Sequence, residues 1–182
     1  MVILGIDPGT ATTGWGIISI KDKVLSIKNL RPQNTKNKIQ NTIELVNYGC
    51  ISTSKERGMG ERLVQIRKEL KKLLQQQKPD IICIEEHFFG KNKKTAISVS
   101  QARGVILEAA ATSKASIFEY QGFAIKHVLT GERFADKKKI EKAVKELLGR
   151  KKLEKPANGF LDDAVDGIAI AIYHAVTSNS KS

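Results

Sequence analysis

The hydrophobic pattern changes its period about one third of the way along the chain, and this change constrains the fold more than any other feature. Residues 2–6, 14–20 and 43–51 are short apolar runs bounded by turn-forming residues, which is typical of β-strands that pair with their neighbours in sequence. From residue 60 to residue 77 the leucines and isoleucines recur every three or four positions instead, which predicts an amphipathic helix. The chain therefore opens with a β-meander and then changes to helical segments.

Strands and helices alternate after this change. Residues 81–84 (IICI) are apolar on both faces, which predicts a central strand, and residues 115–120 predict another strand. Apolar residues at helical spacing predict further helices over 95–113, 137–149 and 161–176. Antiparallel strands followed by strand–helix alternation indicate an α/β domain built around a mixed sheet.

The length of 182 residues and the hydrophobic content of 41% suit one domain with a real core. We expect this single domain over residues 1–176. The polar segment 21–42, rich in Lys, Asn and Gln, is expected to be an extended hairpin tip or a flexible loop insertion, and residues 177–182 a frayed tail.

No apolar run reaches the roughly 18 residues that a membrane-spanning helix needs, and the N-terminus lacks the features of a secretion signal. We therefore expect a cytoplasmic protein with no membrane partner. Cys50 and Cys83 lie in apolar runs and form no metal-binding pattern, so we expect buried free thiols in a reducing compartment.

Basic residues dominate the charge. The chain has 31 Lys and Arg against 19 Asp and Glu, a net charge of +12. Residues 126–155 hold eleven basic and five acidic residues, and residues 87–103 hold four basic residues and no acid: Lys91, Lys93, Lys94 and Arg103. Such an excess points to a polyanionic partner, although a basic surface that serves only solubility is the alternative.

Acids at strand ends need a reason in so basic a chain. Asp7 ends the first strand, and Glu85 directly follows the strand 81–84. On the last helix Asp166 shares a face with an acid one turn earlier, either Asp162 or Asp163, since the spacing does not choose between them. Each acid taken alone has a structural explanation, and the acids of the last helix could simply complement the helix dipole.

Together, however, these acids can meet at one rim of the sheet. Crowded carboxylates repel one another and raise their own pKa values. A hard divalent cation relieves that repulsion, and oxygen ligands suit Mg²⁺, or Mn²⁺ as a substitute. Two such ions about 4 Å apart can activate a water and stabilise the leaving oxygen of a phosphodiester. An acidic metal cluster on a basic protein therefore predicts a nuclease.

Five motifs occur in order between residue 2 and about residue 175: Gly5-Ile6-Asp7-Pro8-Gly9, Thr13-Gly14-Trp15-Gly16, Ile84-Glu85, Gln101-Ala102-Arg103-Gly104 and Asp163-Ala164-Val165-Asp166-Gly167-Ile168-Ala169-Ile170-Ala171. Together they resemble the RuvC family of bacterial Holliday-junction resolvases. The resemblance implies an RNase H-like fold, with a mixed five-stranded sheet flanked by helices. It also implies a homodimer, Mg²⁺-dependent nicking of four-way DNA junctions in recombination and repair, and the branch-migration partners RuvA and RuvB.

The resemblance also implies roles for individual residues. It assigns the family's four catalytic, metal-binding acids and so selects Asp163 over Asp162: Asp7, Glu85, Asp163 and Asp166. Phe88, or its neighbour Phe89, resembles the aromatic residue inserted near the junction crossover, with a core phenylalanine as the alternative. Lys126 and Lys137 resemble the family's lysines beside the scissile phosphate. Other basic residues are expected near the DNA: Lys91, Lys93, Lys94, Arg103 and Lys138.

One departure from the family is the longer and more basic segment 21–42, which is expected to be a disordered insertion or, alternatively, an extra DNA-contacting arm. The helix 95–113, rich in small residues, is a candidate for the dimer contact, with packing on the sheet as the alternative. The three histidines, His87, His127 and His174, are expected to be ordinary surface or partly buried residues.

Two other functions fit parts of the sequence. A junction-binding protein that does not cut DNA would share the basic surface, but it would gain nothing from four acids facing DNA. The run from Gly5 to Thr10 also resembles the first phosphate loop of actin-like ATPases, yet those proteins need a duplicated domain and a second such loop.

Overall fold

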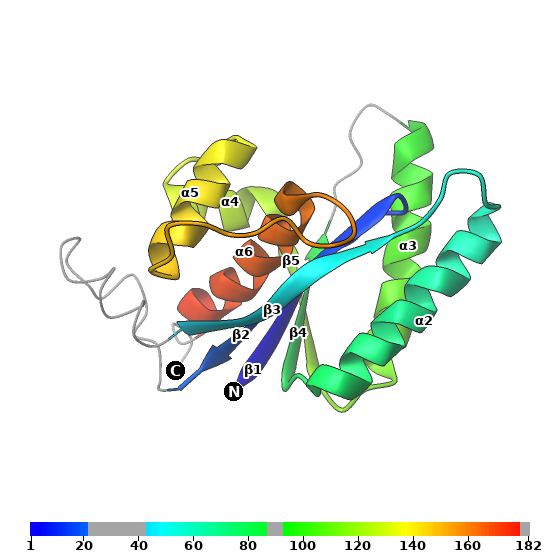
Figure 1. Cartoon of the computed structure of the whole chain (residues 1–182), viewed down its shortest axis with the longest axis horizontal. Helices are drawn as coiled ribbons and strands as arrows, with labels where there is room; N and C mark the ends of the chain where they lie inside the picture. Colours follow the sequence, from blue (N-terminus) through cyan, green and yellow to red (C-terminus); the bar gives the residue numbers. More distant parts are fainter. Residues whose placement is uncertain (22–42, 87–92, 179–182) are drawn as a thin grey trace.

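The strands of the chain form one mixed five-stranded sheet. The computed structural model describes residues 1–21, 43–86 and 93–178, with side chains in the last range described from residue 96 onward. Within these residues the sheet order is β3-β2-β1-β4-β5, as Figure 1 shows. The strands are β1 (Val2–Asp7), β2 (Thr12–Ile20), β3 (Ile43–Ser52), β4 (Ile81–Glu86) and β5 (Ser116–Gln121). The first three strands pair antiparallel, and β4 and β5 run parallel to β1, so the predicted α/β fold with a mixed five-stranded sheet is confirmed.

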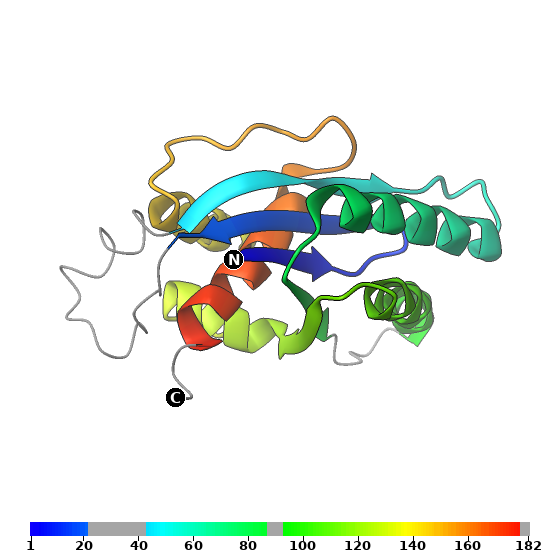
Figure 2. The ribbon, with the colours of Figure 1, turned by 90° about the horizontal axis from the view of Figure 1, so that it is seen from below.

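Helices cover both faces of this sheet and give three layers (Figures 1 and 2). The described helices are α2 (Met59–Gln77), α3 (Lys93–Ala111), α4 (Gly122–Thr130), α5 (Lys137–Leu147) and α6 (Leu161–Thr177). On one face α2 and α3 bury apolar residues against β1, β2 and β4, and on the other face α6 lies on the sheet with α4 and α5 beside it.

The sequence pattern missed one helix. The nine residues of α4 follow β5 without an intervening loop, and only one of them, Ile125, is fully buried, so the helix leaves almost no periodic signal. At the other end, α6 continues to Thr177, whose hydroxyl donates a hydrogen bond to the Tyr173 carbonyl at 2.7 Å. Thr177, expected to open the tail, therefore belongs to this helix. Residues 179–182 lie outside the described part of the chain, as does nearly all of the segment 21–42.

The small residues of α3 serve the core of the monomer. Ala102, Ile106, Ala109 and Ala110 are fully buried in the layer between α3, α2 and the sheet. These four residues thus pack on the sheet, which was the alternative considered for this helix. Gly104, by contrast, is exposed, with open space at its α-carbon.

Both cysteines are free thiols, as expected. Cys83 is fully buried, and burial raises the pKa of its thiol. Cys50 is only half-buried rather than buried, and burial remains the main cause that raises its pKa to about 11. Among the described residues, no helix is both long enough and apolar enough to cross a membrane.

The helix α6 approaches β1 and β2 very closely. Gly5 and Gly16 face each other across these strands, and Gly14 faces Asp7. A Cβ atom on Gly16 would lie 2.5 Å from the backbone nitrogen of Ile168, and one on Gly14 would overlap the carbonyl oxygen of Asp163. The helix therefore rests directly on the strand backbones, which only glycine permits.

We expect Gly16→Ala to lower the free energy of unfolding by about 1–3 kcal/mol or more, because the added methyl group must push the α6 backbone off the sheet. Gly104→Ala is the matched control: its methyl group meets open space in a helix, so stability should stay equal or rise by up to about 1 kcal/mol. Urea denaturation of the three proteins measures both effects. Equal stability of the two variants would contradict the close approach.

Candidate active site

Three carboxylates meet at the end of β1. Asp7 is the last residue of this strand, and Asp163 and Asp166 lie in the first two turns of α6. One oxygen from each of the three half-buried carboxylates lies within 4.8 Å of the others. Asp7 shares its sheet face with Gly5, two residues before it, so its side chain points to the side on which α6 rests. Gly14 opposite Asp7 lets the start of α6 come close enough to complete the group.

Glu85 borders this group without joining it. It lies near the end of β4, which runs parallel to β1, so both acids reach the same edge of the sheet. Its carboxylate rests against the α-carbon of Gly122, where any Cβ atom would overlap it. Among neighbouring charges, that of Glu85 does most to raise the pKa of Asp7. The structure thus brings the four predicted acids to one place, three of them tightly.

Burial and mutual repulsion make these acids hard to ionise. Burial is the main cause that raises the pKa of Glu85 to about 7 and that of Asp166 to about 6. The pKa of Asp7 lies well above its usual range because of burial first and then the charges of the other three acids. The pKa of Asp163 is also raised, mainly by burial. Without a metal, some of these carboxylates therefore remain partly protonated near neutral pH.

Two of the predicted lysines lie beside the carboxylates. The Lys137 Nζ is 3.7 Å from Asp162 Oδ2 and 3.9 Å from Asp163 Oδ1, and its charge lowers the pKa values of Asp163 and Asp166. Lys126, on α4, likewise lowers the pKa values of Glu85 and Asp166. Asp162 is half exposed and lies outside the tight group, so the geometry favours Asp163 as the ligand.

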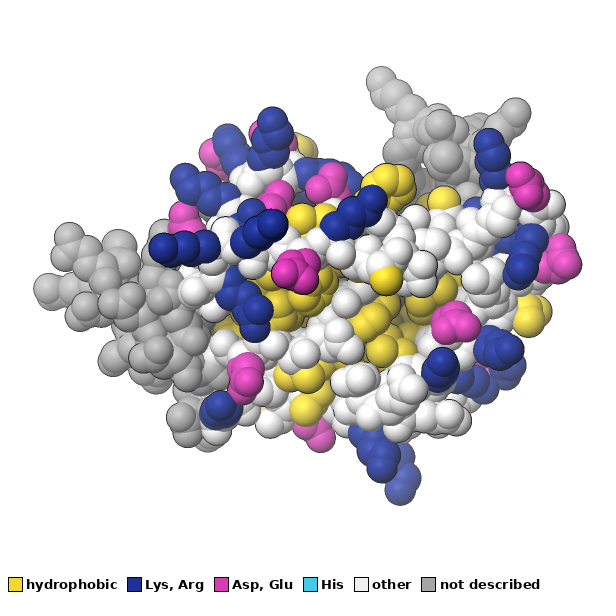
Figure 3. Space-filling model, in the orientation of Figure 1, with side chains coloured by type: hydrophobic (Ala, Val, Ile, Leu, Met, Phe, Trp, Pro, Cys, Tyr) yellow, Lys and Arg dark blue, Asp and Glu magenta, His cyan; other side chains and the backbone are white. Residues whose placement is uncertain are grey.

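The remaining residues expected near DNA fall into two classes. Arg103 forms an ion pair with Glu119, and Lys138 is exposed on α5. The others lie outside the described residues or, in the case of the two lysines that begin α3, outside the described side chains: Phe88, Phe89, Lys91, Lys93 and Lys94. Figure 3 shows Lys and Arg side chains gathered over α5 and the segment that joins it to α6.

The described histidines stand apart from the tight carboxylate group. His174 is buried on α6, its Nδ1 shares a 2.6 Å hydrogen bond with the Tyr120 hydroxyl, and burial lowers its pKa. His127 is exposed, and His87 lies outside the described residues. His127 fits the expectation of an ordinary surface residue, whereas His174 is more deeply buried than the partly buried residue expected.

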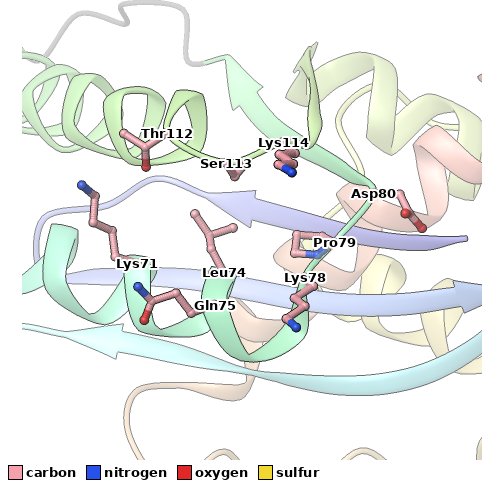
Figure 4. Close-up of a pocket in the computed structure, with 9 residues that line it drawn as sticks. All are labelled: Lys71, Leu74, Gln75, Lys78, Pro79, Asp80, Thr112, Ser113 and Lys114. Carbon is pink, nitrogen blue, oxygen red and sulfur yellow. The ribbon is translucent and has the colours of Figure 1, made fainter.

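A separate pocket lies far from the acids. It has a volume of about 570 Å³ and opens between the C-terminal ends of α2 and α3, where Lys71, Leu74 and Thr112 line it (Figure 4). Asp80, also in its wall, accepts a hydrogen bond of 2.7 Å from the backbone of Val2 at the start of β1. The pocket therefore lies at the opposite end of the parallel strands from Asp7.

Comparison with known protein families identifies the family to which this arrangement of acids and close-packed glycines belongs. A model of the family described as crossover junction endodeoxyribonuclease RuvC matches residues 3–174. The chain belongs to the RuvC family. The RuvC protein of Caldicellulosiruptor saccharolyticus is 38% identical over 180 residues, covering 99% of this chain and 95% of the relative. That of Fusobacterium nucleatum is 39% identical over 181 residues, covering 100% of this chain and 83% of the relative.

Solved structures agree with this family. Thermus thermophilus RuvC superposes with a TM-score of 0.76 at 26% identity over 98% of this chain and 96% of its own. The same protein in complex with Holliday junction substrate gives 0.77 over 98% and 94%. The yeast mitochondrial Holliday junction resolvase Ydc2, at 11% identity and a TM-score of 0.59, shares the fold. The expected RNase H-like α/β fold is confirmed.

RuvC family membership implies a divalent metal, and the site fits one. Every donor in the tight group is a carboxylate oxygen, which suits a hard cation. Burial, and after it the charges of the neighbouring acids, raises the pKa values of these acids, and a bound cation would favour their charged forms.

We expect the stability of the metal-free protein to fall as the pH rises from about 4 to about 7. Asp166 and Glu85 bind protons with pKa values of about 6 and about 7 in the native state, above their usual 3.8 and 4.5. The native state therefore holds more protons than the unfolded state in this window, and that advantage disappears as the pH passes the native values. Thermal denaturation in chelator from pH 4 to pH 8 measures the slope.

Asp166→Asn should flatten this slope, whereas Glu56→Gln, at an exposed turn before α2, should leave it unchanged. Mg²⁺ should raise the melting temperature of the wild-type protein at pH 8 and have little effect at pH 5, where protons occupy the site. A wild-type slope equal to that of Asp166→Asn would contradict the assignment.

Proposed function

We propose that this RuvC-family protein resolves Holliday junctions as an endonuclease that makes paired symmetric nicks in four-way DNA during recombination and repair. The observation that carries the proposal is the tight group of Asp7, Asp163 and Asp166 in a chain of net charge +12. Membership of a family of crossover junction endodeoxyribonucleases, and the likeness to a RuvC structure bound to Holliday junction substrate, support it.

The four acids Asp7, Glu85, Asp163 and Asp166 would hold two Mg²⁺ ions, with Mn²⁺ as a substitute. Such ions supply Lewis acidity and lower the pKa of a bound water, which hydrolysis of a phosphodiester requires. The acids of the chain fix that site, and their burial excludes bulk water from one side of it.

In the cleavage step, a water oxygen forms a bond to phosphorus in line with the bond to the 3′ oxygen, which breaks. The water loses a proton and the leaving oxygen gains one, so the products carry a 5′-phosphate and a 3′-hydroxyl. Lys137 and Lys126, whose charges both act on the carboxylates, would stabilise the charge that develops on the phosphate. Lys137 also lowers the pKa values of Asp163 and Asp166, which favours their ionised forms.

Resolution needs two strands cut symmetrically, so we infer a homodimer with one site in each subunit. Residues 1–176 would form the nuclease domain, acting in the cytoplasm on junctions presented by RuvA and RuvB. Further contacts to junction DNA would come from the basic and aromatic residues that the family resemblance assigns to it: Phe88 or Phe89, Lys91, Lys93, Lys94, Arg103 and Lys138. A junction-binding module that does not cut is disfavoured, because clustered carboxylates repel phosphates.

Asp7→Asn should abolish cleavage of a four-way junction in Mg²⁺ while junction binding survives, because the basic surface is unchanged and one ligand is lost. Gel assays on a mobile junction and a linear duplex of the same sequence, with Mg²⁺ and with chelator, measure both. Glu56→Gln is the control and should cut as the wild type does. Binding without any cut by the wild type, in both Mg²⁺ and Mn²⁺, would overturn the nuclease assignment.

Lys137 and Lys138 offer a matched pair, because they are adjacent and only Lys137 contacts the acids among the described interactions. Lys137→Ala should lower the single-turnover cleavage rate by about 10²-fold or more, since it removes a charge at the reacting phosphate. It should also move the acid limb of the pH–rate profile to higher pH, because the pKa values of Asp163 and Asp166 rise without it. Lys138→Ala should change the rate by less than about threefold and mainly weaken salt-sensitive binding. Equal effects of the two substitutions would refute the role of Lys137.

A further inference from the structure

Two phenylalanines are exposed on segments that lead into the carboxylate site. The Phe134 side chain is 91% exposed and that of Phe160 65% exposed, the two most exposed phenylalanines among the described residues. Neither residue was singled out by the sequence pattern, because exposure of an aromatic ring has no periodic signal.

The position of the two rings links them to the acids. Phe134 precedes Lys137 by three residues, and Phe160 precedes Asp162 by two. Lys137 and Asp162 lie 3.7 Å apart, so the segments that carry Phe134 and Phe160 come together beside the carboxylates. Three residues span at most about 11 Å, so each phenylalanine lies within reach of a strand bound at the carboxylates.

The backbone of Phe160 is held firmly although its ring is free of the core. Gly159 adopts a φ of 89°, which favours glycine, and a Cβ atom there would lie 2.5 Å from the Cys50 Cβ on β3. The Phe160 carbonyl accepts hydrogen bonds from the Cys50 thiol at 3.3 Å and the Ala164 backbone N–H at 3.4 Å. The chain thus fixes this residue between β3 and α6 and presents its ring to solvent.

The residues around Phe134 are held in a similar way. Ala135 is buried, with 2% of its surface exposed, and Glu132 forms an ion pair with Lys139 at 2.7 Å. Arg133 places its guanidinium 4.6 Å from the centre of the Phe123 ring. The residues on both sides of Phe134 are therefore engaged, while its own ring points outward.

Basic residues lie close to Phe160 in space and to Phe134 in the chain, where Glu132 and Asp136 also flank Phe134. The Lys155 Nζ lies 5.8 Å from the centre of the Phe160 ring, and Lys137 and Lys138 follow Phe134 closely in the chain. Aromatic faces next to cations suit unpaired nucleotides, because each base can stack on a ring while the cations contact its phosphate. A paired duplex keeps its bases stacked inside and offers no such face.

We propose that Phe134 and Phe160 stack on unpaired nucleotides of the DNA strand held at the carboxylate site, and so favour branched over linear DNA. This proposal rests on the proposed function and names how that site would recognise its substrate. It assigns the two residues to substrate binding and leaves the cleavage chemistry to the acids and lysines.

The test measures the affinity of Phe134→Ala, Phe160→Ala and the double variant for a four-way junction and a linear duplex, by fluorescence anisotropy in chelator. Each single substitution should weaken junction binding by about tenfold and the double one by more, since base–aromatic stacking contributes strongly to such binding. Duplex binding should change by less than twofold. Phe134→Trp and Phe160→Trp should retain junction affinity, and Val46→Ala, an exposed apolar residue on β3, is the control. Unchanged melting temperatures exclude misfolding.

Cleavage of the junction by the wild type in Mg²⁺ is measured in parallel. If the wild type cuts but both alanine variants bind the junction as the wild type does, the stacking proposal fails and the proposed function stands. Equal losses on duplex and junction, or Trp variants as weak as the Ala variants, would also overturn it. If the wild type does not cut, the proposed function fails, and selective loss of junction affinity in the variants would still support the stacking surface.

Discussion

The contact of α6 with the backbones of β1 and β2 is the constraint on which the site depends. Three glycines on one face of these strands, Gly5, Gly14 and Gly16, place no side chain between the strand backbones and the helix at their positions. The helix therefore lies close enough for Asp163 and Asp166 to reach Asp7 at the end of β1. A side chain at Gly14 or Gly16 would overlap the α6 backbone, so any larger residue there would move the helix, and its two acids, away from Asp7.

This closeness has an energetic cost. Burial and like charges raise the pKa values of all four acids, so the folded protein carries repulsion that the unfolded chain does not. The fold offsets part of it with the charges of Lys137 and Lys126, which reach the acids from α5 and α4. The site thus buries like charges, which proteins usually avoid. Carboxylates with such raised pKa values are common at functional sites.

Much of this arrangement could be predicted from the sequence. The apolar runs and the change of period predicted the sheet and four of the five described helices. The ends of two predicted strands identified Asp7 and Glu85 as candidate site residues. Spacing alone could not choose between Asp162 and Asp163, because both share a helix face with Asp166; the choice needed either the family pattern or the contact of α6 with Gly14. The helix α4 was missed because only Ile125 is fully buried in it. The exposed rings of Phe134 and Phe160 were missed because burial depends on tertiary packing, which periodicity does not encode.

The contact between the glycines and α6 also means that the fold and the site place different demands on the sequence. Gly5, Gly14 and Gly16 are demanded by packing, whatever the acids do, whereas the acids are useful only when the glycines have already brought α6 down onto the sheet. A descendant could therefore lose its carboxylates and keep its fold and basic surface, but the reverse order of loss would leave acids with no partner. In a distant relative, glycines at these positions would therefore indicate a shared fold. Only the acids would indicate whether that relative still cleaves DNA.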